Sequence, residues 1–144
     1  MSPSNGIPDA VRRAQTAASD PEVSAWVAAN AGSGKTYVLA QRVINLLLKG
    51  IEPEKILCIT FTKAAAANMA KQVFDRLARW TTLDDAALDT AIREHSTMAG
   101  DPRRRTLARQ LFARALETPG GIKVRTIHAF CTQLLHQFPF EANV

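Results

Sequence analysis

Ala29-Asn-Ala-Gly-Ser-Gly-Lys-Thr36 lies between an apolar run and an amphipathic segment, and the fold class of this chain follows from it. The stretch matches the phosphate-loop pattern Gly-x4-Gly-Lys-[Ser/Thr], with Ala29 in place of the first glycine. Two glycines, Gly32 and Gly34, allow the backbone to curl until successive N–H groups point at phosphate oxygens. Lys35 is expected to reach the β- and γ-phosphates, and the Thr36 hydroxyl to ligate Mg²⁺. The stretch therefore predicts binding of a nucleoside triphosphate.

The flanks of this loop supply the strand before and the helix after that a phosphate loop requires. Ser24–Ala29 is a short apolar run and predicts a buried strand. Gly34–Lys49 predicts a helix that Gly50 ends. The apolar stripe expected to face the core on this helix consists of Leu39, Val43, Leu46 and Leu47.

Further strands and helices are expected to alternate along the chain. Lys55–Phe61 predicts a second strand, and because it is apolar almost throughout we expect both of its faces to be covered. Thr62 can cap a helix predicted over Lys63–Trp80. The core stripe expected on that helix is Ala66, Ala70, Val73 and Leu77. The remaining predicted elements are helices at Ala10–Ser19, Asp84–His95, Arg103–Leu116 and Ala129–Phe138 and a strand at Ile122–Thr126.

This order of elements predicts an α/β domain, a P-loop NTPase (RecA-like) fold in which helices flank a parallel sheet. Residues 1–13 are expected to be a flexible leader, and residues 14–144 to form the domain, with a helical insert at about 81–118. Three strands are fewer than a complete RecA-like sheet contains. We therefore expect the sheet to be incomplete at its C-terminal end.

Composition indicates a soluble chain with a basic surface. Its 144 residues have a formal net charge of +5, which suits a polyanionic partner. No apolar run approaches the length of a membrane span, so a cytoplasmic protein without membrane association is expected. The two cysteines, Cys58 and Cys131, lie among apolar residues and are expected to be buried reduced thiols.

Three further segments resemble the UvrD/Rep-type superfamily 1 helicases. Ile56–Ala67 is similar to motif Ia of that family, and Thr126–Phe130 to its Thr-x-His-x-Phe segment; both contact single-stranded DNA there. Gln15 matches the position of the family's Q motif, whose glutamine reads the adenine edge. The resemblance implies ATP as the nucleotide. The nucleotide-binding residues that it implies, together with the loop pattern, are Gln15, Ala29, Asn30, Ala31, Gly32, Ser33, Gly34, Lys35, Thr36 and Tyr37.

Within that family, the amino-acid sequences of these motifs are similar to those of AddA-type helicase–nuclease subunits of AddAB double-strand-break repair complexes. The likeness runs from about Ala14 to Val144 and includes the polar insert that ends Leu-Glu-Thr-Pro-Gly-Gly. It implies a parent protein that is an ATP-dependent 3′–5′ DNA helicase and nuclease in double-strand-break repair and recombination. The partners that it implies are single- and double-stranded DNA and a second, AddB-like subunit.

Physical chemistry supports DNA contact at two strand ends. N–H groups and hydroxyls at a strand end and helix start can hold a phosphodiester, and aromatic faces can stack on bases. The candidate DNA-binding residues are Thr60, Phe61, Thr62, Lys63, Thr126, His128 and Phe130. Phe61 is equally consistent with a core position, and a core position is favoured for Phe130. Thr62 has a second role as a helix cap, which does not exclude DNA contact.

Two features leave alternatives open. Tyr37 follows the phosphate loop where many relatives carry arginine, and it either stacks on adenine or is an ordinary helix residue. The second feature is the basic helix of the insert, for which a solvated face is favoured over duplex contact or an interface with the AddB-like partner. Its basic residues are Arg103, Arg104, Arg105, Arg109 and Arg114.

Hydrolysis needs a second acidic element, an apolar strand followed by Asp-Glu, and the sequence contains none. Asp84-Asp85 follows Thr-Thr-Leu, which is no buried strand. We therefore expect an N-terminal piece of a larger helicase that binds nucleotide and DNA without hydrolysing ATP. The alternatives are another P-loop phosphotransferase and a non-catalytic DNA-binding or interaction module.

Overall fold

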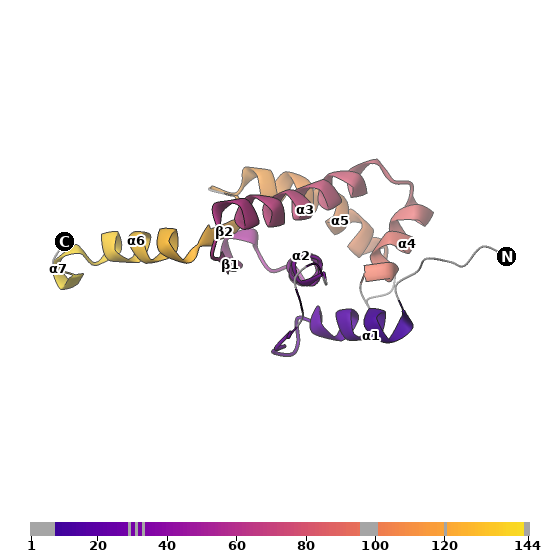
Figure 1. Cartoon of the computed structure of the whole chain (residues 1–144). Coiled ribbons are helices and arrows are strands. Elements are labelled where there is room, and N and C mark those ends of the chain that lie inside the picture. Colours follow the sequence, from indigo (N-terminus) through magenta and orange to yellow (C-terminus); the bar gives the residue numbers. More distant parts are fainter. Residues whose placement is uncertain are drawn as a thin grey trace.

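The computed structural model describes residues 8–28, 30, 32, 34–95, 101–119 and 121–142, and the statements below concern these residues. Helices dominate, and one small sheet lies beside them (Figure 1). The elements in chain order are α1 (Asp9–Ala18), α2 (Lys35–Leu48), a 3₁₀ turn (Pro53–Lys55), β1 (Leu57–Thr60), α3 (Lys63–Thr82), α4 (Asp85–His95), α5 (Pro102–Glu117), β2 (Lys123–Thr126), α6 (Ile127–Gln137) and α7 (Pro139–Ala142).

β1 and β2 pair in parallel, and the two faces of this sheet differ. Cys58 and its register partner Val124 pack against the core beneath α3. On the opposite face Leu57 and Ile59 are 44% and 47% exposed. The expectation that both faces of this strand are covered is therefore wrong for the described residues. Its continuous apolar run does not distinguish a strand covered on both faces from one that is covered on a single face.

The core lies where α2, α3, α4 and α5 pack together. Its fully buried large side chains are Ile44, Leu47, Val73, Leu77, Trp80, Leu88 and Ile92. The stripe expected on α3 is confirmed at Val73 and Leu77, but Met69 and Trp80 are buried in place of the two alanines. Ala66 and Ala70 are half-buried.

The stripe expected on α2 is confirmed in most of its positions. Val43 and Leu47 are buried, and Leu46 is partly buried against the core. Leu39 departs from the stripe, because its side chain is 51% exposed. Its neighbours Val38 and Ala40 are buried instead, so burial already begins in the first turns of α2. The spacing of apolar residues therefore predicted the buried face of the later turns but not which residues of the first turns are buried.

The strand expected at Ser24–Ala29 is absent from the described part of this segment. Residues 24–28 have no regular structure and are largely exposed, with Trp26 at 95% exposure, and Ala29 lies outside the described residues. A strand needs a neighbouring ladder to satisfy its N–H and C=O groups. The described sheet has only β1 and β2, so an apolar run alone was insufficient evidence for a strand here.

The segment expected to be a helical insert contains two helices, α4 and α5, that arginines hold together. Asp101 caps α5 by accepting a hydrogen bond from Arg103 N at 2.9 Å. Arg105 forms an ion pair with Asp89 at 2.7 Å, and Arg109 forms one with Asp85 at 2.7 Å. The basic helix is therefore not only a solvated face, because part of its charge ties α5 to α4.

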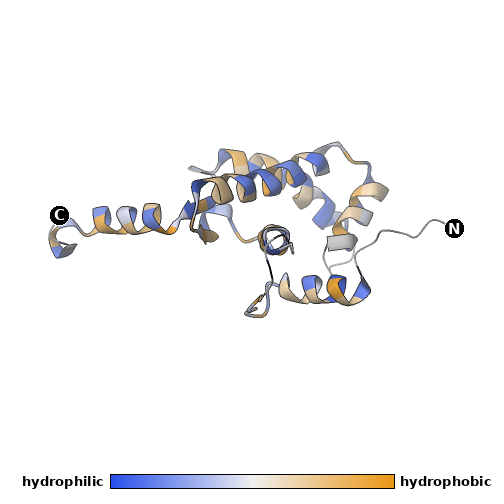
Figure 2. Cartoon of the chain, in the orientation of Figure 1, coloured by the Kyte–Doolittle hydropathy of each residue, from blue (hydrophilic) through white to orange (hydrophobic). Residues whose placement is uncertain are grey.

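The C-terminal end of the described chain extends from the core, whereas α1 lies beside α2 (Figure 1). Residues 9–13 of the expected leader belong to α1, and residues 1–7 lie outside the described residues. α6 projects from the end of β2 and carries hydrophobic residues along its length (Figure 2). Cys131 on α6 is exposed and Cys58 half-buried, so both are free thiols as expected but Cys131 is not buried. No described helix is both long and apolar enough to cross a bilayer.

Candidate functional site

The phosphate loop leads directly into α2, whose N-cap is Gly34. Gly34 and Gly32 have φ angles of +88° and +79°, a region that side chains disfavour, and this curl brings the loop to the start of the helix. Lys35 donates from Nζ to the carbonyl of Asn30 at 2.6 Å. The first N–H groups of α2 lack acceptors within the helix and carry the positive end of its dipole. Ala29, Ala31 and Ser33 lie outside the described residues.

Gln15 on α1 lies against this loop although the whole segment after α1 separates them in sequence. A Cβ placed on Gly34 would be 3.1 Å from Gln15 Nε2, so the amide approaches the glycine backbone closely. The structure therefore brings together Gln15, Gly34 and the helix start that carries Lys35 and Thr36. Among the described residues no group of three or more His, Cys, Asp or Glu could hold a metal ion. Thr36 is the candidate Mg²⁺ ligand, together with phosphate oxygens.

Tyr37 makes a contact that the sequence did not predict. The Arg76 guanidinium of α3 lies over its ring, 5.0 Å from the centroid, and Arg76 also donates to Gln41. Burial lowers the pKa of Arg76, while Tyr37 opposes that shift. Tyr37 is thus more than an ordinary helix residue, since it links the phosphate-loop helix to α3. In the sequence, this contact is indicated only by the position of Arg76 next to Leu77, which belongs to the stripe expected to be buried on α3.

The candidate DNA-binding residues other than Phe130 gather where the two strands end. Thr60 pairs in register with Thr126, so the two motif segments lie side by side. Thr62 caps α3 by accepting from Ala65 N at 3.1 Å, and Thr126 caps α6 by accepting from Ala129 N at 3.2 Å. Two capped helix starts therefore meet at one edge of the sheet.

The side chains at this edge are open to solvent. Phe61 is 84% exposed, and Lys63 and His128 are also exposed. Phe61 is therefore not a core residue, and its open ring can act as a stacking platform. Neither helix start has an acidic residue in its first turn, so no carboxylate there repels a phosphate.

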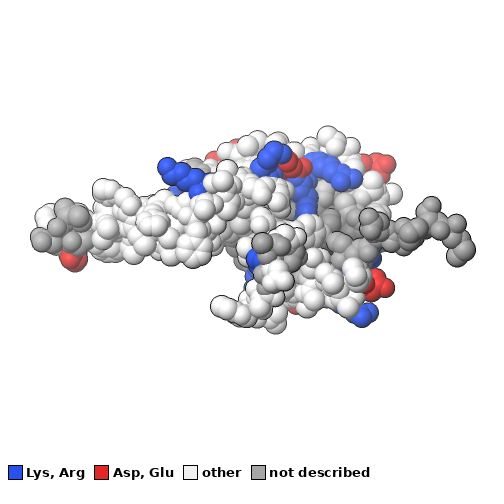
Figure 3. All heavy atoms as spheres, viewed as in Figure 1, with Lys and Arg blue, Asp and Glu red and all other residues white. Residues whose placement is uncertain are grey.

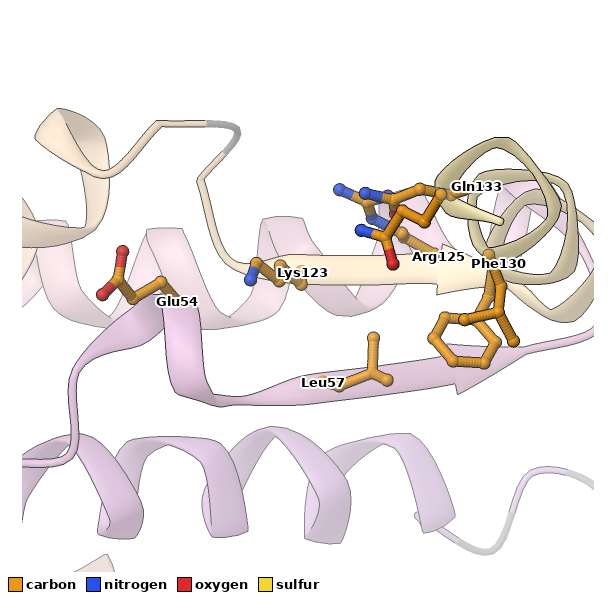
Figure 4. A pocket seen from close by; sticks show the side chains of 8 residues that line it. Glu54, Leu57, Lys123, Arg125, Phe130 and Gln133 are labelled. Carbon is orange, nitrogen blue, oxygen red and sulfur yellow. The ribbon is translucent and has the colours of Figure 1, made fainter. Parts of the chain in front are cut away.

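Phe130 lies elsewhere, on the uncovered face of the sheet (Figure 4). It is half-buried and lines a groove of about 210 Å³ with Leu57, Lys123 and Arg125. The favoured core position is wrong, because Phe130 lies at the open face of the sheet and outside the hydrophobic core. Basic side chains gather over the body of the molecule, whereas the α6 arm shows few charges in the same view (Figure 3).

Comparisons with known proteins identify relatives of this chain by sequence. Residues 11–144 match the family model described as the UvrD/REP helicase N-terminal domain. The chain is 32% identical over 130 residues to a protein of Ligilactobacillus salivarius named as an ATP-dependent helicase/nuclease subunit, covering 90% of this chain and 9% of that protein. Proteins of the same name are 35% identical over 112 residues in Latilactobacillus sakei, covering 78% of this chain and 10% of that protein, and 32% over 125 residues in Enterococcus faecalis, covering 87% and 8%. No solved structure matches the chain at a significant level.

Proposed function

This chain belongs to the UvrD/REP helicase N-terminal domain family, and on that premise we propose that it forms the nucleotide-binding segment of an ATP-dependent DNA helicase/nuclease. The chain spans about a tenth or less of the curated relatives that it matches. Helicase and nuclease activities, and an AddB-like partner, are therefore proposed for a whole protein in double-strand-break repair. The main evidence for the proposal is that Gln15 lies against Gly34 at the start of α2, where Lys35 is the first residue of the helix.

ATP would lie with its phosphates against the loop and the first turn of α2. The N–H groups there donate to phosphate oxygens, and the helix dipole favours their negative charge. Lys35 would exchange its bond with the Asn30 carbonyl for a bond with a phosphate oxygen. The Thr36 hydroxyl would complete the shell of a Mg²⁺ ion that the phosphates hold, and the ion supplies charge neutralisation.

A single DNA strand would lie across the edge where β1 and β2 end. The N–H groups at the starts of α3 and α6 and the Lys63 ammonium suit phosphodiester oxygens. The exposed Phe61 ring suits a base. Because the sequence lacks an Asp-Glu strand end, we propose that this chain binds ATP without hydrolysing it.

Fluorescence titration with a ribose-labelled ATP analogue tests this proposal. Lys35→Ala should weaken binding by at least about tenfold, since a charge-assisted bond to phosphate is lost. Lys55→Ala is the matched control, because Lys55 is an exposed lysine that pairs with Glu52 in the turn before β1. Equal affinity of the wild type and Lys35→Ala would overturn nucleotide binding. DNA affinity that persists in that case would favour a non-catalytic DNA-binding module instead.

A further inference from the structure

Three polar residues are buried among the described residues, and they belong to one hydrogen-bonded network. Ser19, Gln41 and Asn45 are 1%, 4% and 4% exposed. Asn45 Nδ2 donates to the Ser19 carbonyl at 3.0 Å, and Gln41 Nε2 donates to Asn45 Oδ1 at 3.2 Å. Arg76 of α3 donates to Gln41 Oε1. The network therefore runs from α3 through α2 to the residue that ends α1.

A second set of bonds holds the segment that follows α1. Arg42 of α2 donates from Nη1 to the Ala18 and Asp20 carbonyls, at 3.2 and 2.6 Å, and from Nη2 to the Val23 carbonyl at 2.6 Å. One planar guanidinium thus satisfies three carbonyls in a fixed geometry. Arg42 and Asn45 are both on α2 and bond the same end of α1, so the two sets act together.

These hydrogen bonds determine the position of α1, because apolar packing does not hold this helix. The helix spans Asp9–Ala18, and none of its residues is buried. An exposed helix of this length is marginal unless tertiary contacts fix it. The described contacts that fix its C-terminal end are the bonds from Asn45 and Arg42.

Gln15 depends directly on this anchor. It lies one turn before Ser19, whose N–H donates to the Gln15 carbonyl at 3.0 Å. Its amide lies against Gly34 of the phosphate loop. A displacement of Ser19 therefore displaces Gln15 relative to the loop, because helical hydrogen bonds join them within a single turn.

We propose that Arg42 and Asn45 are positioning residues for recognition of the nucleotide base. They hold the end of α1 on α2 so that the Gln15 amide faces the base of a nucleotide whose phosphates lie in the loop. The inference rests on the proposed function and on the role that the family resemblance implies for Gln15, which is to read the adenine edge. It adds that selection among bases is set by residues that touch neither base nor phosphate.

The first experiment measures base selection by competition against the labelled ATP analogue. The competitors are ATP, inosine triphosphate, which changes the edge of the base, and inorganic tripolyphosphate, which has no base. The wild type should prefer ATP over inosine triphosphate by about fivefold to tenfold, the value of one or two hydrogen bonds. Arg42→Ala and Asn45→Ala should reduce that preference to less than about twofold, while tripolyphosphate affinity changes little.

Matched variants separate positioning from general damage. Arg42→Lys retains a donor and should recover part of the preference. Arg12→Ala is the matched control, because it removes an exposed arginine of α1 whose side chain pairs only with Asp9 among the described residues. Gln15→Ala should abolish the preference, and adding Arg42→Ala should cause no further loss, because coupled residues are not additive. An Arg42→Ala protein with the wild-type preference would overturn the inference.

The second experiment needs no nucleotide, so it remains informative if the proposed function fails. Hydrogen exchange should show that Arg42→Ala speeds exchange of α1 amides by at least about tenfold, while the buried part of α2 stays protected. Unchanged exchange in α1 would overturn the inference regardless of ligand binding. Faster exchange in α1 with no nucleotide binding by the wild type would instead refute the proposed function and retain the anchor.

Discussion

Thr60, the last residue of β1, is the register partner of Thr126, the last residue of β2. This pairing joins two motifs that lie far apart in sequence and places the starts of α3 and α6 at one edge. A nucleic-acid strand that reaches one helix start therefore also reaches the other. The relationship makes the sheet edge a single surface and predicts how substitutions there will behave.

Phe61→Ala should weaken binding to a single-stranded oligonucleotide by about 1–3 kcal/mol, since one stacking contact is lost. It should change the free energy of unfolding by less than about 0.5 kcal/mol, because the ring is 84% exposed. Fluorescence anisotropy and urea unfolding measure the two effects. Phe140→Ala removes a similarly exposed ring on α7 and should leave DNA affinity unchanged. Equal losses for both variants would indicate non-specific contact.

Thr62→Ala should lower the free energy of unfolding by about 1 kcal/mol, because Ala65 N loses its acceptor at the start of α3. Thr62→Ser keeps the hydroxyl and should recover most of that stability. Chemical denaturation of the three proteins measures the effect. If Thr62→Ser is as unstable as Thr62→Ala, the methyl group matters and capping does not.

Gly34→Ala should abolish nucleotide binding as well as cost stability. The residue has φ of +88°, and the added methyl would meet Gln15 Nε2 at 3.1 Å. Gly50→Ala is the matched control, since its φ is +84° and nothing lies within 4 Å of the added methyl. Both variants should lose about 1–2 kcal/mol of stability. Titration with labelled ATP should show lost affinity only for Gly34→Ala, and equal loss in both would contradict a local cause.

The Asp85–Arg109 pair should stabilise the protein only above acidic pH. The hydrogen bond from Arg109 holds the pKa of Asp85 below its ordinary value of 3.8. A lowered folded-state pKa gives stability that is present above the unfolded pKa and is lost as pH falls through the folded one. The difference in Tm between wild type and Arg109→Gln should therefore shrink as pH falls below 3.8.

Arg114→Gln is the control for that series, because the described partner of the Arg114 side chain is the neutral side chain of Gln110. Its Tm difference from wild type should stay constant over the same pH range. Added salt should reduce the Arg109→Gln effect near neutral pH, since the pair is exposed. A constant difference for Arg109→Gln at all pH values would exclude the ionic contribution.

The two thiols should react at different rates. Burial raises the pKa of Cys58, which lies on the sheet face beneath α3, and less thiolate forms there. Cys131 is exposed on α6. A disulfide reagent at mildly alkaline pH should modify Cys131 first, as mass mapping of the labelled peptide will show. Rapid labelling of Cys58 would contradict the packing of β1 against α3.

Much of the local structure could be predicted from sequence. The helices at residues 10–19, 34–49, 63–80, 84–95 and 103–116 are all present, with ends within about two residues. The cap at Thr62 is also as predicted. Each of these features depends on residues within one helical turn, and a local pattern contains that information. The open sheet face and the irregular segment at 24–28 were not predicted, and the sequence left open whether Phe61 lies in the core or in solvent.

The features of the candidate site also fall into two groups, those that depend on neighbours in the sequence and those that depend on the packing of helices. The glycines of the loop, Lys35 and the helix that follows depend on neighbours in the chain, so the sequence alone determined that a glycine turn leads into the start of α2. The contact of Arg76 with Tyr37, the bond from Asn45 to Ser19 and the approach of Gln15 to Gly34 join different helices. Only the packing of those helices establishes them, because their directions and separations arise from side chains distant in sequence that fill one common core.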